Sequence, residues 1–259
     1  MRVSVFFRSA AIALAIGSVS VVSASGQTVD ELVSKHIAAR GGYEKLKAIE
    51  TMRITRTVGT PFTTVKVVIY KKRPDLIRWE QTPKGQTEAV PRAINTTVAW
   101  DMAQGKVVTR PEPLAVEGRE TDGDFDGLLV DWQKKGHTVS LEGKQKVGTA
   151  DTYKLKVTTK GGTVREVYLD ATTFLEAQVV GRVRLPAIDP RTKEHRYNDT
   201  IFLFSDYRDV NGVKFPFAVD EERTGGGITQ SFAHFTEKIE VNVPVDDALF
   251  AVPQAAGGK

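Results

Sequence analysis

The sequence contains no cysteine, and this absence excludes several kinds of chemistry. Without thiols the chain has no disulfides, no thiolate metal sites, no cysteine nucleophile and no N-terminal cysteine to carry a lipid. A strong charge of one sign is also missing, because the formal net charge is only +4 and the basic residues are scattered along the chain. So weak a bias gives no indication of nucleic-acid binding.

Catalytic and metal-binding motifs are equally scarce. No serine stands in a G-x-S-x-G turn, and "TGGGI" at 224–228 lacks the lysine and helix of a phosphate-binding loop. We therefore expect no catalytic residue, no metal and no cofactor. A hydrolase built on two carboxylates stays open, since the sequence does not indicate which pair would meet. The histidines show no metal-binding spacing and are interpreted as structural or surface residues: His36, His137, His195 and His234.

The first residues have the three-part pattern of a secretory signal peptide. Arg2 and Arg8 are followed by the apolar run "SAAIALAIGSVSVV" and then by the small residues of "VSASGQ". The run is shorter than the roughly 20 apolar residues of a membrane span. We expect a signal peptide over residues 1–24, cleaved after Ala24, and a soluble protein exported to the periplasm. Cleavage after Gly26 and an uncleaved anchor are the alternatives.

After this segment the pattern is first helical and then changes to a period of two. Thr28 and Glu31 have the spacing of a capping box, and "RGG" at 40–42 separates the first helix from a second over 43–49. Apolar and polar residues then alternate, and turn signals recur about every 8–12 residues, which is typical of an antiparallel meander or barrel. We expect about ten strands in a single domain over residues 28–253, with a disordered tail over 254–259.

The stretch "TDGDFDGLLVDWQ", residues 121–133, interrupts the strand pattern. Its alternating aspartates resemble a calcium-binding EF-hand loop, but Gln133 replaces the bidentate glutamate that closes such a loop. Prolines and a glycine upstream argue against the entering helix that an EF-hand needs. We instead predict a short amphipathic helix from Phe125 to Lys135, with acidic residues at its start and lysines at its end. Its apolar stripe consists of Phe125, Leu128, Leu129 and Trp132.

Large aromatic side chains recur in the predicted strands, among them Trp79 and Trp100. In "TIFLFSDY", alternation places Phe202 and Phe204 on one face of the strand and apolar residues on the other face as well. Such a strand is either buried on both sides or lines a ligand cavity on one of them. The sequence leaves both alternatives open.

Four stretches carry a resemblance that covers most of the chain after residue 24. They are "VDELVSKHIAARGGYEKLKAIETMRIT", "DGLLVDWQKKGHTVSLEGKQKVGTADTYKLKVTTKGGTVREVYLDATTFL", "FSDYRDVNGVKFPF" and "VPVDDALFAVP". In pattern and turn placement the chain resembles the LolA-like superfamily of periplasmic outer-membrane lipoprotein-sorting proteins. The resemblance implies a mainly β fold with a few helices (α+β), an open antiparallel half-barrel covered on its concave face by short helices. It also implies an arginine inside the barrel that ties down the lid. Arg53 and Arg56 are both candidates, and neither is assigned this role.

The same resemblance implies that the cavity holds the acyl chains of a lipoprotein or another hydrophobic guest. We predict a monomeric periplasmic carrier of lipid or lipoprotein acyl chains, in outer-membrane lipoprotein sorting or related envelope lipid transport. The alternative is an envelope-stress sensor or protein-binding module on the same half-barrel, with an inner- or outer-membrane protein as its partner. No nucleic acid is expected. The predicted cavity and lid residues are Phe125, Leu128, Leu129, Trp132, Trp79, Trp100, Phe202 and Phe204.

Overall fold

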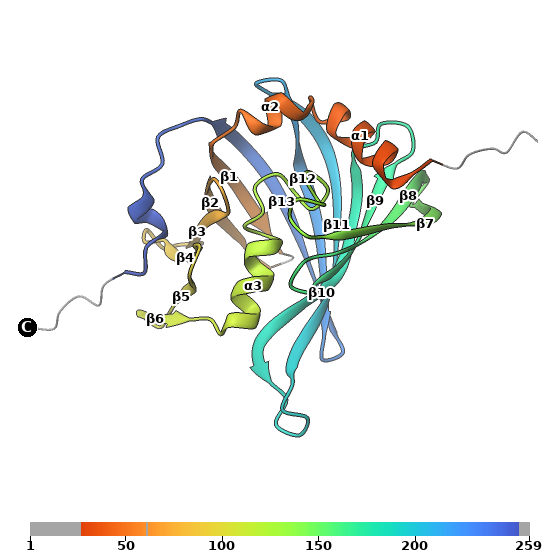
Figure 1. Cartoon of the computed structure of the whole chain (residues 1–259). Helices are drawn as coiled ribbons and strands as arrows, with labels where there is room; N and C mark the ends of the chain where they lie inside the picture. The colour runs from red at the N-terminus through yellow and green to blue at the C-terminus, as the bar shows by residue number, and fades with distance from the viewer. Residues whose placement is uncertain (1–26, 61, 254–259) are drawn as a thin grey trace, which may run out of the picture.

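A single antiparallel sheet forms the body of the computed structural model, which describes residues 27–60 and 62–253. Figure 1 shows this sheet curving around helix α3 (Glu112–Glu120). The thirteen strands run in the order β6-β5-β4-β3-β2-β1-β13-β12-β11-β10-β9-β8-β7, and the edge strands β6 and β7 do not pair, so the half-barrel is open as predicted. The predicted signal peptide at 1–24 and the predicted tail at 254–259 lie outside the described residues.

The strands differ in length between the two sides of the sheet. Strands β10 to β13 have 13 to 16 residues, whereas β4 to β6 have only four or five. The predicted meander is confirmed, but ten strands was too few because strands this short give little period-two signal. The bounds are β1 Thr51–Gly59, β2 Thr64–Lys72, β3 Leu76–Pro83, β4 Val90–Ile94, β5 Ala99–Ala103, β6 Lys106–Thr109, β7 Thr138–Val147, β8 Ala150–Thr158, β9 Val164–Asp170, β10 Glu176–Ile188, β11 His195–Val210, β12 Val213–Gly225 and β13 Ile228–Val241.

Two N-terminal helices, α1 (Val29–Ala39) and α2 (Tyr43–Lys47), lie across one end of the half-barrel (Figure 1). The capping box predicted for α1 is confirmed. The Glu31 backbone N–H donates to the Thr28 hydroxyl at 3.2 Å, and the Thr28 backbone N–H donates to the Glu31 carboxylate at 2.9 Å. Between the helices Gly41 has a φ of +122°, and a Cβ there would lie 2.1 Å from the Gly212 carbonyl oxygen. Only glycine lets the chain turn so close to the β11–β12 hairpin.

The helix on the concave side is not the one that the sequence predicts. The prolines upstream of residue 121 were expected to exclude a helix, yet α3 occupies residues 112–120. Pro111 is the N-cap and Pro113 lies in the first turn, where a backbone N–H has no intrahelical acceptor to lose. The small Gly118 also brings α3 close to β4, because a Cβ at this position would lie 2.6 Å from the Ile94 Cδ1 atom.

The predicted helix from Phe125 to Lys135 is absent. Residues 121–136, here named the cover loop, form a series of turns. Gly127 and Asp131 have φ values of +89° and +54°, which a right-handed helix does not allow. The acidic side chains that were expected to favour a helix start instead bind lysines and arginines on the loop itself and on neighbouring elements.

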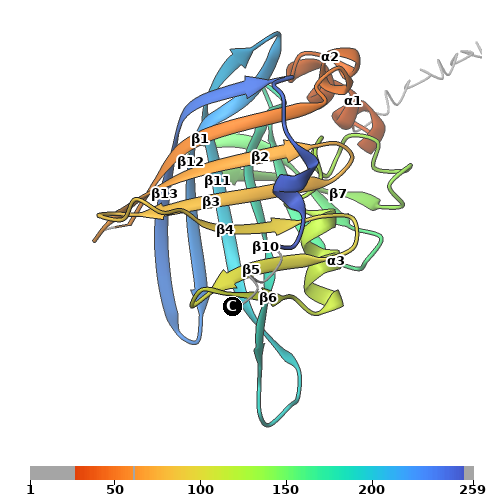
Figure 2. The same cartoon turned by 90° about the vertical axis from the view of Figure 1, so that its left-hand side faces the viewer.

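Apolar clusters anchor the helices and the cover loop to the sheet. One cluster joins Leu46 of α2 and Phe125 of the cover loop to Phe215 of β12. A second joins Leu32 of α1 and Leu129 of the cover loop to strands β8 and β9. The short helix η1 (Asp247–Phe250) contacts β3, and Figure 2 shows it in dark blue in front of the sheet near the ends of β2 and β3. Among the described residues, no helix is long and apolar enough to cross a membrane.

Candidate ligand-binding cavity

The concave face of the sheet holds a cavity with two adjoining lobes of about 440 and 660 Å³. Because side chains alternate between the faces of a strand, the wall common to both lobes includes Ile54 of β1, Trp79 of β3 and Phe202 of β11. Leu114 of α3 and Leu128 of the cover loop line the smaller lobe. The result is a mostly apolar space between a curved sheet and its covering segments.

The predicted cavity and lid residues are divided between this cavity and the core. Phe125 lines the larger lobe. Leu129 is 1% exposed and packs under α1, and the half-buried Trp132 packs against the same cluster. The other five predicted residues line the smaller lobe: Trp79, Trp100, Leu128, Phe202 and Phe204. Six of the eight therefore meet at the cavity, and their role in ligand binding stays a prediction.

Trp100 has a structural partner as well. Its ring is 1% exposed, and its Nε1–H donates to the Phe250 carbonyl oxygen at 3.2 Å. The indole therefore fixes η1 to the sheet and contributes to the cavity only as part of its wall. Trp79, Phe202 and Phe204 line both lobes and are the aromatic side chains best placed to contact a guest.

Strand β11 is not buried on both sides. Phe202 and Phe204 face the cavity, with their ring centroids 6.4 Å apart. Ile201 and Leu203 line a shallow groove outside the half-barrel, together with Phe235. Leu203 is 39% exposed and Phe235 is 58% exposed. Strand β11, which is apolar on both faces, thus separates an internal cavity from an open groove.

Charged side chains that were not predicted from the sequence as part of the site also line the cavity. Arg110 holds Asp101 through two hydrogen bonds of 2.6 and 3.0 Å. Glu117 of α3 pairs with Arg165 at 3.1 Å and thereby ties α3 to β9. Glu221 is bound by Arg223 and by His234. Burial raises the pKa of Glu221, but the hydrogen bonds from His234 and Arg223 outweigh it and hold that pKa below its ordinary value.

Further cations line the larger lobe, among them Arg56, Lys71 and Arg92. Lys71 donates to the Asp124 carbonyl oxygen at 2.8 Å, and burial lowers its pKa to about 8. Within the described chain, neither Arg56 nor Arg92 has a hydrogen bond or an ion pair. The sequence did contain a signal for them, because each lies two residues from an inward apolar residue, Ile54 or Ile94, in an alternating strand.

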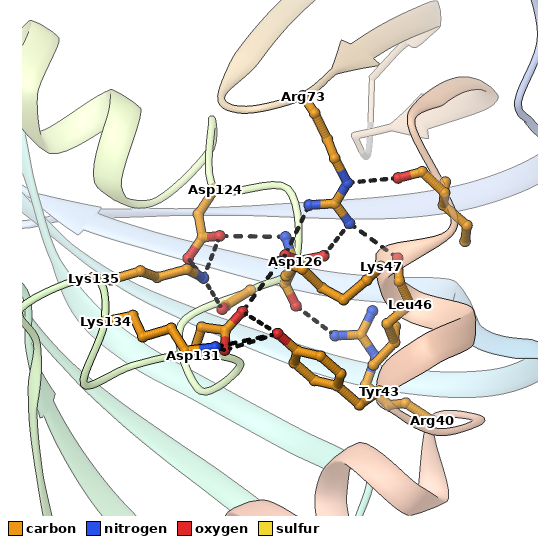
Figure 3. Close-up of polar contacts among 12 residues, drawn as sticks. Arg40, Tyr43, Leu46, Lys47, Arg73, Asp124, Asp126, Asp131, Lys134 and Lys135 are labelled. Atoms are coloured by element: carbon orange, nitrogen blue, oxygen red, sulfur yellow. Dashed lines mark hydrogen bonds and ion pairs between the residues drawn. The ribbon is translucent and has the colours of Figure 1, made fainter.

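Ion pairs fix the cover loop to Lys47 of α2 and to Arg73 (Figure 3). The Asp126 carboxylate accepts two hydrogen bonds from Arg73, at 2.6 and 2.9 Å, and one from Lys47 of α2 at 2.7 Å. Arg40 donates to the Asp126 carbonyl oxygen at 2.7 Å. Asp131 binds Lys47 at 3.1 Å, so two aspartates of the loop share one lysine of α2.

These contacts answer two questions left by the sequence. Arg53 points away from the cavity and lies 3.8 Å from Glu240, while Arg56 has no bond to the cover loop, so Arg40 and Arg73 are the arginines that tie it down. Of the three aspartates in the EF-hand-like run, Asp124 is engaged by Lys135 and Asp126 by Arg73 and Lys47. The part of the chain that the structure describes contains no group of three or more acidic or histidine side chains placed to hold a metal ion.

Known proteins resemble this chain in structure and not in sequence. No protein-family model matches it, and no curated protein sequence does. A LolA superfamily protein from Nitrosomonas europaea matches 88% of this chain and 99% of its own, with a TM-score of 0.57 and 10% identity. An outer-membrane lipoprotein-sorting protein domain from Vibrio parahaemolyticus covers 86% and 95%, with a TM-score of 0.52 and 10% identity. A DUF1329 family protein from Desulfovibrio piger covers 87% and 98%, with a TM-score of 0.50 and 13% identity.

Proposed function

We propose, from the LolA-like fold that the chain shares with these structures, that it is a non-enzymatic carrier that binds lipid or lipoprotein acyl chains in its half-barrel. The observation that supports this most directly is the apolar cavity between the sheet and the cover loop. Its size lies in the range of roughly 300–1,000 Å³ that is usual for ligand sites. Each buried CH₂ of a guest contributes about 0.8 kcal/mol, so partial burial of one chain suffices for reversible carriage.

The proposal includes the place where the carrier acts. Residues 1–24 act as a cleaved signal peptide, and the protein carries its guest through the periplasm in lipoprotein sorting or related envelope lipid transport. One of the structural relatives is described as an outer-membrane lipoprotein-sorting domain, which supports this assignment. Mass spectrometry of the purified protein tests the cleavage directly, since a mature chain that begins after Ala24 is expected.

Lipid binding is tested with a pair of variants on one strand. The protein is expressed with its N-terminal segment, and co-purifying lipid is identified by mass spectrometry before and after delipidation. Phe202→Asp puts a charge into the cavity and should abolish lipid retention, whereas Leu203→Asp on the outer face should retain it. Absence of lipid from the unmodified protein in repeated preparations, or equal retention by both variants, would count against the carrier.

A specific observation also favours the alternative of a protein-binding module. The outer groove exposes Leu203 and Phe235, two large apolar side chains on a face that the cavity does not use. Residues of this kind are frequent at protein interaction sites. An envelope membrane protein that is captured by the unmodified chain and by Phe202→Asp, but not by Phe235→Asp, would support this function.

A further inference from the structure

Two arginines in the cavity have no acid of their own. Arg56 projects from β1, and its Nε atom is buried without a hydrogen-bond partner. Its nearest acids, Asp122 and Glu221, act on it only through their longer-range field, and burial still lowers the Arg56 pKa to about 10. A guanidinium group in this position has lost hydration without gaining a hydrogen bond or an ion pair, which costs free energy.

Arg92 of β4 is in the same state. Its Nε atom is also buried without a partner, and its guanidinium group lies 4.4 Å from the centre of the Trp79 ring. Asp101 lies directly opposite Arg92 in the strand register, but Arg110 holds both oxygens of that carboxylate. The acid that faces Arg92 in the sheet is therefore already engaged, and Asp122 acts on Arg92 through its field without an ion pair.

One of the two acids whose field reaches Arg56 is engaged as well. Glu221 accepts hydrogen bonds from Arg223 and from His234 at 2.9 Å, and these two groups use both of its oxygens. Asp122 of the cover loop is exposed and makes no ion pair with any described residue. The larger lobe thus contains two guanidinium groups whose donors are available for an additional anion.

We propose that the half-barrel is selective for amphiphiles with an anionic oxygen headgroup, a carboxylate or a phosphate, bound by Arg56 and Arg92. The acyl chain lies along the aromatic wall formed by Trp79, Phe202 and Phe204, which borders the same lobes. A planar guanidinium group binds carboxylate and phosphate through two parallel N–H donors, and such charge-assisted bonds are about twice as strong as neutral ones. The inference rests on the proposed carrier function and names the class of lipid that the carrier prefers.

The test compares ligands that share one chain and differ in the headgroup. Delipidated protein is titrated near neutral pH with palmitate, with hexadecanol and with inorganic phosphate, and binding is followed by calorimetry. Palmitate should bind at least roughly tenfold more tightly than hexadecanol, because hydrogen bonds to a charged group contribute about 1.5–3 kcal/mol. Inorganic phosphate should neither bind with comparable affinity nor displace palmitate.

Variants then locate the selectivity. Arg56→Gln combined with Arg92→Gln should remove the preference for palmitate and leave hexadecanol binding within about twofold. Lysine at both positions should restore part of the preference for palmitate. This result would show that the glutamine variant loses the preference through lost charge and not through misfolding. Arg53→Gln is the matched control, since Arg53 is on the same strand as Arg56 but faces outward beside Glu240.

The possible failures are distinguishable. Binding of hexadecanol and palmitate with equal affinity would overturn the headgroup site and leave the carrier in place. Displacement of palmitate by phosphate at similar concentrations would also overturn it, because the site would then take small anions without a chain. Binding of neither amphiphile would remove the carrier proposal itself and this inference with it.

Discussion

Two arginines of the half-barrel, Arg73 and Arg56, show opposite uses of the same side chain. Arg73 follows β2 and makes four hydrogen bonds, two to Asp126 and one each to the carbonyl oxygens of Ile49 and Leu46. Arg56 lies inside the sheet and donates to no described residue. The first arrangement fixes the cover loop to α2, while the second leaves a desolvated cation facing the cavity.

This difference separates a structural region from a ligand-facing one. Around Asp126 each charge has a partner, so the removal of one member leaves another charge unpaired in a buried position. Around Arg56 the charge is already unpaired, so its removal relieves a cost. The same kind of substitution should therefore change stability in opposite directions in the two regions.

The largest effect is expected where the cover loop is tied down. Asp126→Asn keeps the shape of the side chain but removes the charge that Arg73 and Lys47 share, and Asp126 is only 5% exposed. The free energy of unfolding in urea should fall by about 3 kcal/mol, the usual cost of breaking a buried ion pair. The matched control is Asp151→Asn. The Asp151 carboxylate pairs with Lys146 at the surface, so its removal should not measurably change the free energy of unfolding.

Acid should break the same contact in the unmodified protein. Burial opposes ionisation of Asp126, but the hydrogen bonds from Arg73 and Lys47 outweigh it and lower its pKa to about 2. Since the ordinary value is about 3.9, the stabilisation is complete above that pH and is lost as the pH falls towards 2, a loss of roughly 2 kcal/mol. Unfolding measured from neutral to acid pH should show the unmodified protein and Asp126→Asn converging. Parallel curves at all pH values would exclude Asp126 as the source.

A contact inside the cover loop should contribute less than one that leaves it. Asp124 binds Lys135 at 2.7 Å, but both residues belong to the loop, so the pair does not join it to the body of the protein. Asp124→Asn should cost about 1 kcal/mol, the usual value of one hydrogen-bonded contact. Amide hydrogen exchange should then be faster within residues 121–136 than in α2. Equal losses of unfolding free energy for Asp124→Asn and Asp126→Asn would show that a contact within the loop contributes as much as one that joins the loop to the rest of the protein.

The sequence predicted local features of the fold well. The capping box at Thr28, the break at Gly41 and the alternating strands all depend on residues within a few positions of one another. The cover loop was predicted wrongly because its conformation depends on distant partners. Asp126 is bound by Lys47 and Arg73, which are 79 and 53 residues away, and no local pattern reveals them.

The candidate site was predicted in part for a related reason. Alternation correctly placed Phe202 and Phe204 on one face of β11, which the structure shows to be the cavity side, and the same rule places Arg56 on the same face of β1 as Ile54. Of the cations in the cavity, Arg56 was a candidate only through the resemblance, and the others were not predicted. The tertiary structure decides which arginine of the cavity has an acidic partner. Asp101 lies opposite Arg92 in the strand register, but it accepts its hydrogen bonds from Arg110, which follows β6.

The smallest effect, and the one with the opposite sign, is expected at Arg56. Arg56→Met should leave the free energy of unfolding unchanged or raise it by up to about 1 kcal/mol, because an apolar side chain of similar length replaces an unpaired cation. The same substitution at Arg73 should lower stability by about 3 kcal/mol, because it leaves Asp126 with Lys47 alone. Urea unfolding of the two variants side by side measures both. A loss of 2 kcal/mol or more in Arg56→Met would mean that Arg56 has a structural partner after all, and the contrast between the two arginines would disappear.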